Sequence, residues 1–417
     1  MNVIRHSKLS EVCRVGLASY FMVFVLVMAR PITISAEDSP QYRGLRGNGV
    51  SDEEKWMHQW AETGPQVKWE RETGIGFSSP VTKDGVVICT GYQAEGVRVS
   101  ALDLNTGEEI WSFEYEAPLD AKDFEGGPTS SPLIEGDCVY LLSRGGTAYA
   151  LRLADGVLLW QVDLVTEAGV RIPGWGFSGA VRSFNSRLLL NVGDSGVCLR
   201  QEDGMVLWAS EDREAGYSSA VPFMDQGVPS VILGSGRSYV CVDIETGQER
   251  WRQKWLTSFG CNAADAVVSK DRVFLSSGYS RGSGFFDLST GSPQLIWKHK
   301  DFKSHLGTGL LIDGFLYGVN GDLEAGARIT CMELSTGKIR WIEESFRAGA
   351  VSAAGDRLII LSDDGVLMIA AVNSDSFELL ASARVLNGRC WVPPVITEGK
   401  LLCKNSAGKL ICLDLSE

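Results

Sequence analysis

The stretch that decides the fold is Ala101-Leu-Asp-Leu-Asn-Thr-Gly-Glu-Glu-Ile-Trp111. It returns as Ala150–Trp160, Cys198–Trp208 and Cys241–Trp251, and looser copies run over 285–297 and 331–341. The alternating apolar run predicts a strand, and the Asn-Thr-Gly segment predicts a tight turn whose glycine takes a positive φ. A second strand then carries the Trp. Such a hairpin cannot bury its own apolar face, so we expect the copies to stack on one another.

Each hairpin is part of a longer unit. The unit begins with a small-residue strand such as Ser78-Ser-Pro-Val81, turns at Lys83-Asp-Gly85, and continues through Val86-Val-Ile-Cys89 into the hairpin. Four short strands per unit are typical of propeller blades, and the repeated Trp residues are 43 to 49 positions apart. We therefore predict an all-β chain that forms an eight-bladed β-propeller, with four antiparallel strands in each blade.

The last unit ends one strand short, at Leu410-Ile-Cys-Leu-Asp414. The missing strand is expected at the other end of the chain, where Pro65-Gln-Val-Lys-Trp69 reads as a lone fourth strand with its Trp. Pairing of strand 66–71 with the C-terminal blade would close the ring and remove its open edges. The Trp residues predicted to pack between neighbouring blades are Trp69, Trp111, Trp160, Trp208, Trp251, Trp297 and Trp341.

The N-terminus has the order of an export signal. A basic region with Arg5, Lys8 and Arg14 precedes an apolar run of 15 residues over 15–29, and small residues follow at Ser35-Ala36. The apolar run is short for a membrane span, but a retained anchor is the alternative. We predict a signal peptide over 1–36, an irregular segment over 37–65 and a propeller over 66–417, exported to the periplasm or associated with the cell envelope.

Charge and side-chain chemistry narrow the range of functions. The net charge is −13, and the body after residue 36 carries −16 because the first 36 residues hold four basic side chains and one acidic one. An acidic body disfavours nucleic acid and anionic membrane surfaces as partners. Cysteine replaces alanine at one repeat position, as in Cys198 and Cys241, which predicts buried, unpaired thiols. The histidines are few and scattered, so we expect no metal cluster and place them on the surface.

The Ala-x-Asp-x-x-Thr-Gly-x-x-x-Trp pattern, kept best at 101–111 and 241–251, resembles the quinoprotein (PQQ) repeat. It recurs six times at blade spacing, and the repeats cover nearly everything after residue 65. Two branches share this architecture, namely the PQQ-dependent dehydrogenases and the BamB-like outer-membrane assembly factors. The Gln41-Tyr-Arg-Gly run and the Cys390-Trp-Val-Pro-Pro ending resemble a group of exported PQQ-binding-like propeller proteins of bacteria.

The resemblance leaves two classes of function open. The dehydrogenase branch uses a vicinal cysteine disulfide, a calcium ion and a catalytic Asp, and this sequence has no adjacent cysteines. A shared fold does not by itself carry the activity. We therefore favour an exported, non-catalytic binding or assembly module, a monomer with a protein partner in the envelope and with no metal or catalytic residues. The alternative is a PQQ-dependent dehydrogenase with calcium.

Alignment of the units suggests a binding site. Aromatic side chains precede several of the small-residue strands, and if these strands are innermost, the aromatic residues ring one mouth of the central channel. Such a funnel can bind a flat ring, a sugar or a peptide. The alternative is that the aromatic residues only fill the hub. The candidate residues at the mouth are Phe77, Thr129, Trp175, Phe177, Tyr217, Arg389 and Trp391.

Overall fold

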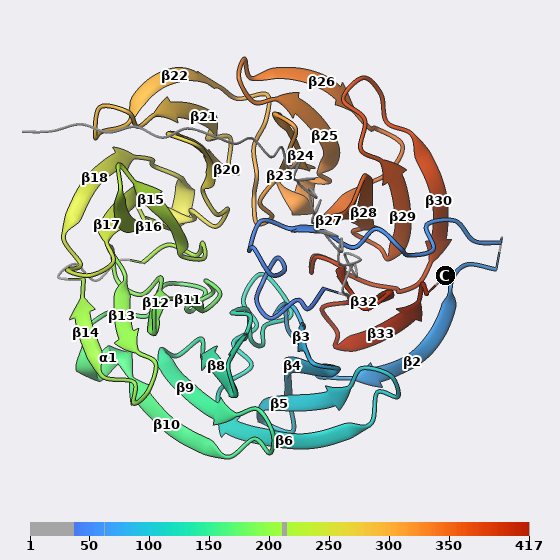
Figure 1. Cartoon of the computed structure of the whole chain (residues 1–417), viewed down its shortest axis with the longest axis horizontal. Coiled ribbons are helices and arrows are strands. Elements are labelled where there is room, and N and C mark those ends of the chain that lie inside the picture. The colour runs from blue at the N-terminus through green and yellow to red at the C-terminus, as the bar shows by residue number, and fades with distance from the viewer. Residues whose placement is uncertain (1–36, 62, 211–214, 417) are drawn as a thin grey trace, which may run out of the picture. The chain divides into compact units, whose positions relative to one another are not determined.

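The computed structural model describes residues 37–61, 63–210 and 215–416. The expected signal peptide over 1–36 lies outside the described residues. Eight blades of four antiparallel strands each are arranged around a common centre (Figure 1), and one of these sheets gains a short parallel fifth strand, so the predicted all-β, eight-bladed propeller is confirmed. The first strand of each blade is innermost, and the fourth is outermost.

The strand bounds follow the repeats. The first four blades are β3 (Val81–Lys83), β4 (Val86–Gln93), β5 (Gly96–Asp103) and β6 (Glu109–Glu116); β7 (Leu133–Glu135), β8 (Cys138–Leu142), β9 (Thr147–Arg152) and β10 (Leu158–Asp163); β11 (Arg182–Phe184), β12 (Arg187–Leu190), β13 (Val197–Arg200) and β14 (Val206–Ala209); and β15 (Val221–Asp225), β16 (Val228–Gly234), β17 (Ser238–Asp243) and β18 (Glu249–Lys254).

The remaining blades are β19 (Val267–Ser269), β20 (Arg272–Ser277), β21 (Gly282–Asp287) and β22 (Gln294–His299); β23 (Leu310–Ile312), β24 (Phe315–Asn320), β25 (Arg328–Glu333) and β26 (Lys338–Ile342); β27 (Ala348–Ala354), β28 (Arg357–Ser362), β29 (Val366–Ala371) and β30 (Leu379–Arg384); and β31 (Val395–Thr397), β32 (Lys400–Lys404), β33 (Lys409–Asp414) and β2 (Gln66–Glu72). The short helices are α1 (Leu164–Glu167), η1 (Ser258–Gly260) and η2 (Leu323–Ala325). Within the described ranges, no helix has the length and apolar character needed to cross a membrane.

The innermost strands begin later than the sequence suggested. The Ser78-Ser-Pro80 stretch precedes β3 and is not part of its ladder. The reason is that the Ser79 N–H donates across to the Ser131 hydroxyl of the next blade at 2.9 Å, and Pro80 has no N–H to donate. These segments therefore join neighbouring blades around the channel.

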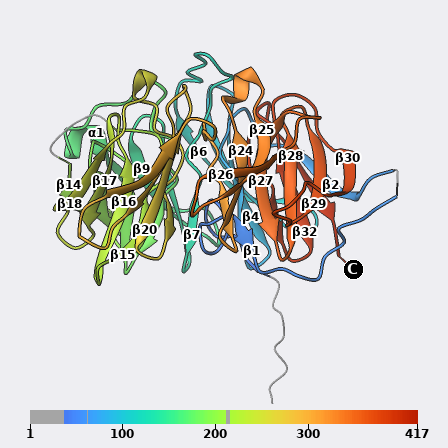
Figure 2. The same ribbon diagram turned by 90° about the horizontal axis from the view of Figure 1, so that it is seen from above.

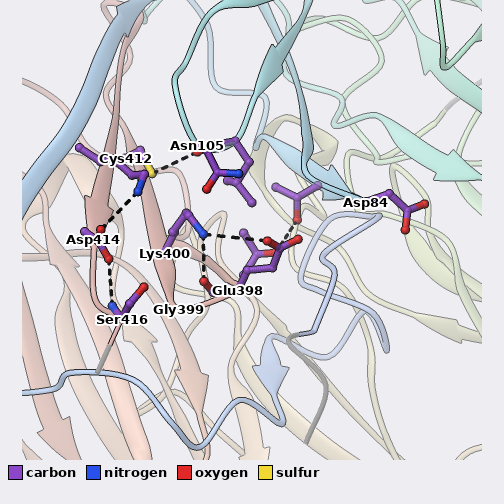
Figure 3. Close-up of polar contacts among 12 residues, drawn as sticks. Asp84, Asn105, Glu398, Gly399, Lys400, Cys412, Asp414 and Ser416 are labelled. Atoms are coloured by element: carbon purple, nitrogen blue, oxygen red, sulfur yellow. Dashed lines mark hydrogen bonds and ion pairs between the residues drawn. The ribbon is translucent and has the colours of Figure 1, made fainter. Parts of the chain in front are cut away.

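Strand β2 is the outermost strand of the eighth blade. It lies antiparallel to β33, with Gln66 opposite Asp414 and Glu72 opposite Lys409. Figure 3 shows the end of this blade, where the Asp414 carboxylate accepts a hydrogen bond from the Ser416 N–H at 3.1 Å. The first and last strands of the ring thus share one sheet, and the edge of β33 is covered.

Most of the motif Trp residues connect one blade to the next. Their Nε1–H groups donate to backbone carbonyls, Trp69 to Leu104, Trp111 to Leu153, Trp160 to Gln201, Trp208 to Ile244, Trp297 to Leu334 and Trp341 to Asn373. Trp251 is also buried, but its Nε1 has no hydrogen-bond partner among the described residues. In the neighbouring blade the Leu288 carbonyl, at the corresponding position, accepts from Gln226 at 3.1 Å.

The segment before β2 crosses the centre of the ring (Figure 1). The Ser39 carbonyl accepts from Thr82 in the first blade, and β1 (Val50–Ser51) pairs in parallel with β27 in the seventh. Farther on, Trp56 is buried between the seventh and eighth blades, 2% exposed. Figure 2 places this N-terminal segment at the lower side of the ring, opposite the short helices in yellow and orange at the top.

The cysteines occupy the core. All nine in the described part of the chain are free thiols, and eight of them are buried; Cys138 is half-buried. Burial raises the pKa of the eight buried thiols, for example to about 12 for Cys198 and Cys412. They therefore pack as small apolar side chains.

Candidate functional site

A pocket of about 170 Å³ opens at one mouth of the central channel. It lies on the face where the innermost strands begin. Most of its lining residues come from the segments that precede these strands, and the equivalent positions of seven blades supply Phe77, Thr129, Ser178, Tyr217, Ala263, Leu306 and Trp391. The rest of the lining comes from Tyr42, from the loop between β6 and β7, and from Arg144, Trp175 and Tyr279 on loops of the second, third and fifth blades. The ring architecture thus brings residues far apart in sequence to one site.

The structure brings together five of the seven predicted mouth residues in this lining: Phe77, Thr129, Trp175, Tyr217 and Trp391. Phe177 lies elsewhere, fully buried in the core between the second and third blades. The reason is a register difference of one residue, since Thr129 hydrogen-bonds to the hydroxyl of Ser178 at 3.0 Å, and Ser178 takes the lining position.

Arg389 stands behind the lining. Its guanidinium pairs with Glu125 at 2.6 Å and lies 4.5 Å from the ring centroid of Trp391. It also lies 5.5 Å from the ring of Phe124. Arg389 therefore holds the β6–β7 loop against the eighth blade by an ion pair and cation–π contacts.

Two aromatic walls face the pocket. On one wall the ring centroids of Phe77 and Phe124 lie 5.9 Å and 5.4 Å from that of Trp391. On the other wall Trp175 lies edge-on to Tyr217 at 5.8 Å. Aromatic groups at these distances form stable, rigid surfaces. A ligand between the walls would meet ring faces and edges on both sides.

The second wall continues to the rim. Phe259 lies edge-on to Trp175 at 6.1 Å and to Tyr279 at 5.8 Å. Its side chain is 74% exposed, and its backbone has a φ of 62°, in the left-handed region that non-glycine residues rarely adopt. A large apolar side chain is therefore held in solvent at the edge of the pocket, at a cost in backbone energy.

Ion pairs fix the β6–β7 loop over the pocket. Arg144 pairs with Asp120 at 3.0 Å and donates to the Trp175 carbonyl at 2.7 Å. Lys122 donates to the Gly174 carbonyl at 2.6 Å, and the indole N–H of Trp175 donates to Asp123 at 3.1 Å. The loop of the first two blades and the Trp175 loop of the third therefore form one connected rim.

The floor of the pocket comes from the N-terminal segment. Tyr42 lines the pocket, and Arg43 beside it donates to the Gly309 carbonyl at 3.0 Å. Arg182 donates to the Tyr42 carbonyl at 2.7 Å. Burial lowers the pKa of both arginines, and it raises the pKa of Asp265 nearby, while the two guanidinium charges counteract that rise. The Gln41-Tyr-Arg-Gly run thus fills the channel beneath the site.

Three lining residues hold polar atoms that lack a hydrogen-bond partner among the described residues: Asp265 Oδ2, His305 Nε2 and Trp391 Nε1. His305 is 2% exposed, so the expectation that the histidines lie on the surface is wrong for this one. Its Nδ1 accepts from the Leu323 N–H at 3.3 Å, which leaves Nε2 as the N–H donor of the neutral ring. Burial lowers the pKa of His305 and favours that neutral form.

Sequence reasoning missed several lining residues. Asp265 carries a signal that could have been found, because it takes the position where Ser131 and Ser219 accept hydrogen bonds from the preceding blade. His305 stands just before the small-residue segment of the sixth blade, but the blade alignment did not extend that far back. Phe124 and Asp120 lie on a loop outside the repeat, where no alignment reaches them.

The described residues do not fit a bound calcium ion. Calcium takes six to eight oxygen ligands, mostly carboxylates and carbonyls. Within the described ranges no three His, Cys, Asp or Glu side chains gather in a way that could hold a metal. In the pocket, Asp120 is already paired with Arg144 and Lys122, and Cys261 is a free thiol. We therefore assign no role to a quinone and calcium pair.

Comparisons with known proteins agree with this architecture. The family model described as outer membrane protein assembly factor BamB matches residues 50–191 and 99–343. The BamB proteins of Escherichia coli and Yersinia pestis are each 24% identical, over 82% and 74% of this chain and 87% and 78% of their own lengths.

Solved structures share the fold. BamB from Moraxella catarrhalis superposes with a TM-score of 0.61 at 14% identity, over 83% of this chain and 96% of that one. A quinohemoprotein alcohol dehydrogenase from Comamonas testosteroni gives 0.65 at 13% identity, over 91% and 80%. At these sequence identities the structural similarity is evidence for a shared fold only. The family match covers more than half of the sequence, and the chain belongs to the family of the outer membrane protein assembly factor BamB.

Proposed function

We propose that this chain is a non-catalytic binding module of the bacterial envelope, and that it holds a protein partner at the mouth pocket. The observation that carries the proposal is the exposed rim residue Phe259, which extends an aromatic wall out of the pocket into solvent. An exposed aromatic side chain next to an aromatic pocket is the arrangement that anchors protein interfaces. The names of the relatives, outer membrane protein assembly factors, support a role in assembly.

Placement in the envelope rests on the sequence and the relatives. The basic, apolar and small-residue order of the first 36 residues supports export. The acidic body supports a partner that is neither nucleic acid nor an anionic membrane surface. A monomer suffices for this function, because every pocket wall described here comes from one chain.

Site-specific photocrosslinking in the native host tests the proposal. A benzophenone side chain replaces Phe259 in one variant and Met224 in a matched control. Met224 is 55% exposed but lies near the end of β15, at the face opposite the pocket. We expect a discrete crosslinked polypeptide from position 259 and none of that mass from position 224. Crosslinking of the same product at equal yield from both positions would contradict binding at the mouth.

A further inference from the structure

The mouth pocket is blind. Tyr42 closes it, and the side chains of Arg43 and Arg182 fill the channel behind Tyr42 through hydrogen bonds to backbone carbonyls. A ligand therefore enters and leaves by the rim alone. A blind pocket suits the end of a projecting group and does not suit a chain threaded through the ring.

The size of the pocket selects a single ring. Its volume is about 170 Å³, and a cavity of about 150 Å³ lined by apolar side chains is known to take benzene. Pockets for drug-sized molecules start at about 300 Å³. The space between the Phe77–Trp391 wall and the Trp175–Tyr217 wall therefore matches one six-membered aromatic ring and is too small for a fused-ring cofactor.

The buried polar atoms without hydrogen-bond partners indicate which kind of chemical group the bound aromatic ring is attached to. His305 Nε2 and Trp391 Nε1 are donors, and Asp265 Oδ2 is an acceptor. Each atom is buried, so its side chain must turn slightly to meet a ligand, and leaving it unpaired is unfavourable. A peptide group supplies both a carbonyl acceptor and an N–H donor.

We propose that the mouth pocket receives one aromatic side chain from an extended segment of the protein partner, and that the amides next to this side chain meet His305, Trp391 and Asp265. This inference rests on the proposed function and gives it a chemical form. The aromatic walls supply the contact area for the ring. The unpaired polar atoms favour an aromatic ring that is attached to a peptide over the same ring as a small hydrocarbon, because only the peptide has amides that can pair with them.

Three probes separate the parts of the proposal. Acetyl-Gly-Phe-Gly-amide carries both the ring and the amides, acetyl-Gly-Ala-Gly-amide carries the amides alone, and toluene carries the ring alone. Ligand-observed saturation-transfer NMR with the full propeller gives the dissociation constant of each. We expect the Phe peptide to bind at least tenfold more tightly than either of the other two. Equal binding of toluene and the Phe peptide would reduce the site to an apolar cavity and overturn the proposal.

Two variants test the polar contacts. Trp391→Phe keeps an aromatic wall but removes the Nε1–H, and Asp265→Asn keeps the shape of the side chain but removes its charge. We expect each to weaken binding of the Phe peptide by 3- to 10-fold. The matched control is Trp341→Phe on the outer strand β26, which also removes an indole N–H, here one bonded to Asn373, but leaves the pocket unchanged.

The outcomes distinguish this inference from the proposed function. If the Phe peptide does not bind while the crosslink from position 259 persists, the partner docks on the rim and the inference about the pocket is wrong. If Trp341→Phe weakens peptide binding as much as Trp391→Phe, the contacts assigned to the pocket are wrong. Loss of both the peptide signal and the crosslink would overturn the inference and the proposed function together. Thermal unfolding of each variant confirms that it is folded.

Discussion

A Cβ atom built on Gly156 would lie 2.4 Å from Cε3 of Trp111 in the preceding blade. The same close approach occurs between Gly107 and Trp69, Gly204 and Trp160, Gly247 and Trp208, and Gly337 and Trp297. The turn glycine thus does more than supply a positive φ, which is 71° at Gly156. It also leaves room for the indole that joins two blades, which explains why the repeat keeps Gly and Trp together.

The first prediction separates these two roles of the glycine. Gly136 has a positive φ of 58°, but a methyl group added at its Cα would have no neighbouring atom within 4 Å. Gly136→Ala should cost only the backbone strain, about 1 to 2 kcal/mol. Gly156→Ala adds a steric overlap with Trp111, which costs roughly 1 to 3 kcal/mol more. Urea unfolding gives both free energies, and equal losses would show that the indole contact is unimportant.

A second prediction uses the one motif Trp whose N–H is unpaired in the described structure. Trp111→Phe removes a hydrogen bond to the Leu153 carbonyl, whereas Trp251→Phe removes a buried donor without a partner. We expect Trp251→Phe to be less destabilising by about 1 kcal/mol. Chemical unfolding of both variants checks this. A larger loss for Trp251→Phe would mean that its Nε1 has a partner in solution.

Closure of the ring gives a third prediction. Strand β2 covers β33, and Trp69 packs against the first blade. Trp69→Ala should cost roughly 3 to 5 kcal/mol, as expected for a large core truncation. Deletion of residues 37–72 should expose the edge of β33 and cause aggregation, which size-exclusion chromatography detects. A truncated chain that stays monomeric and melts like the intact propeller would contradict closure by this strand.

A fourth prediction concerns Lys404, which is 1% exposed and donates to the Gly76 carbonyl at 2.8 Å. Burial lowers the pKa of Lys404 to about 8, below its ordinary value of 10.5. Between these values the unfolded chain binds more protons than the folded one, so this lysine makes stability rise with pH. Titration of buried thiols acts in the opposite direction, and a variant is needed to isolate the lysine.

The comparison is with Lys404→Met. The free energy of unfolding of the natural chain, minus that of the variant, should increase by about 1.5 kcal/mol between pH 8 and pH 9.5, because the slope approaches 1.36 kcal/mol per pH unit between the two pKa values. Urea unfolding at several pH values measures this difference. A difference that stays constant with pH would show that Lys404 titrates near its ordinary pKa in the folded state.

The fifth prediction concerns thiol reactivity. Cys198, Cys241, Cys331 and Cys412 are buried, whereas Cys138 is half-buried. Iodoacetamide should modify Cys138 first in the native protein and leave the other four unmodified. All five should react after denaturation without a reductant. Mass spectrometry of the peptides reads the outcome, and disulfide-linked peptides containing any of these residues would contradict free thiols.

The architecture could be predicted because it depends on local patterns that repeat. The hairpin at 101–111 specifies strand, turn and Trp, and six recurrences leave a closed ring as the arrangement that buries every face. The mouth pocket could be predicted only in part. Trp391 and Tyr217 follow from the alignment of blades, but Phe177 does not, because one extra residue in the third blade shifts the register.

The floor of the pocket could not be predicted from the sequence, for a different reason. Tyr42 and Arg43 belong to a segment with no repeat partner, and their contacts to the third and sixth blades join positions more than 130 residues apart. Asp265 and His305 are buried by the assembled propeller, so no local sequence pattern indicates that they are buried. Non-repeating segments thus decide the chemistry of a repeat protein.

Strand β2 and the residues around Glu53 and Met57 leave the ribosome before the blades, but the partners that they bind in the eighth blade do not exist until that last blade has been made. Glu53 accepts a hydrogen bond from the Gly399 N–H, and the Met57 N–H donates to the carbonyl of Leu415, directly after β33. The nascent chain must therefore keep this early part unpaired while the blades are synthesised. Contacts of such long sequence separation slow folding, and they also leave the seventh and eighth blades incomplete until both ends of the propeller are present.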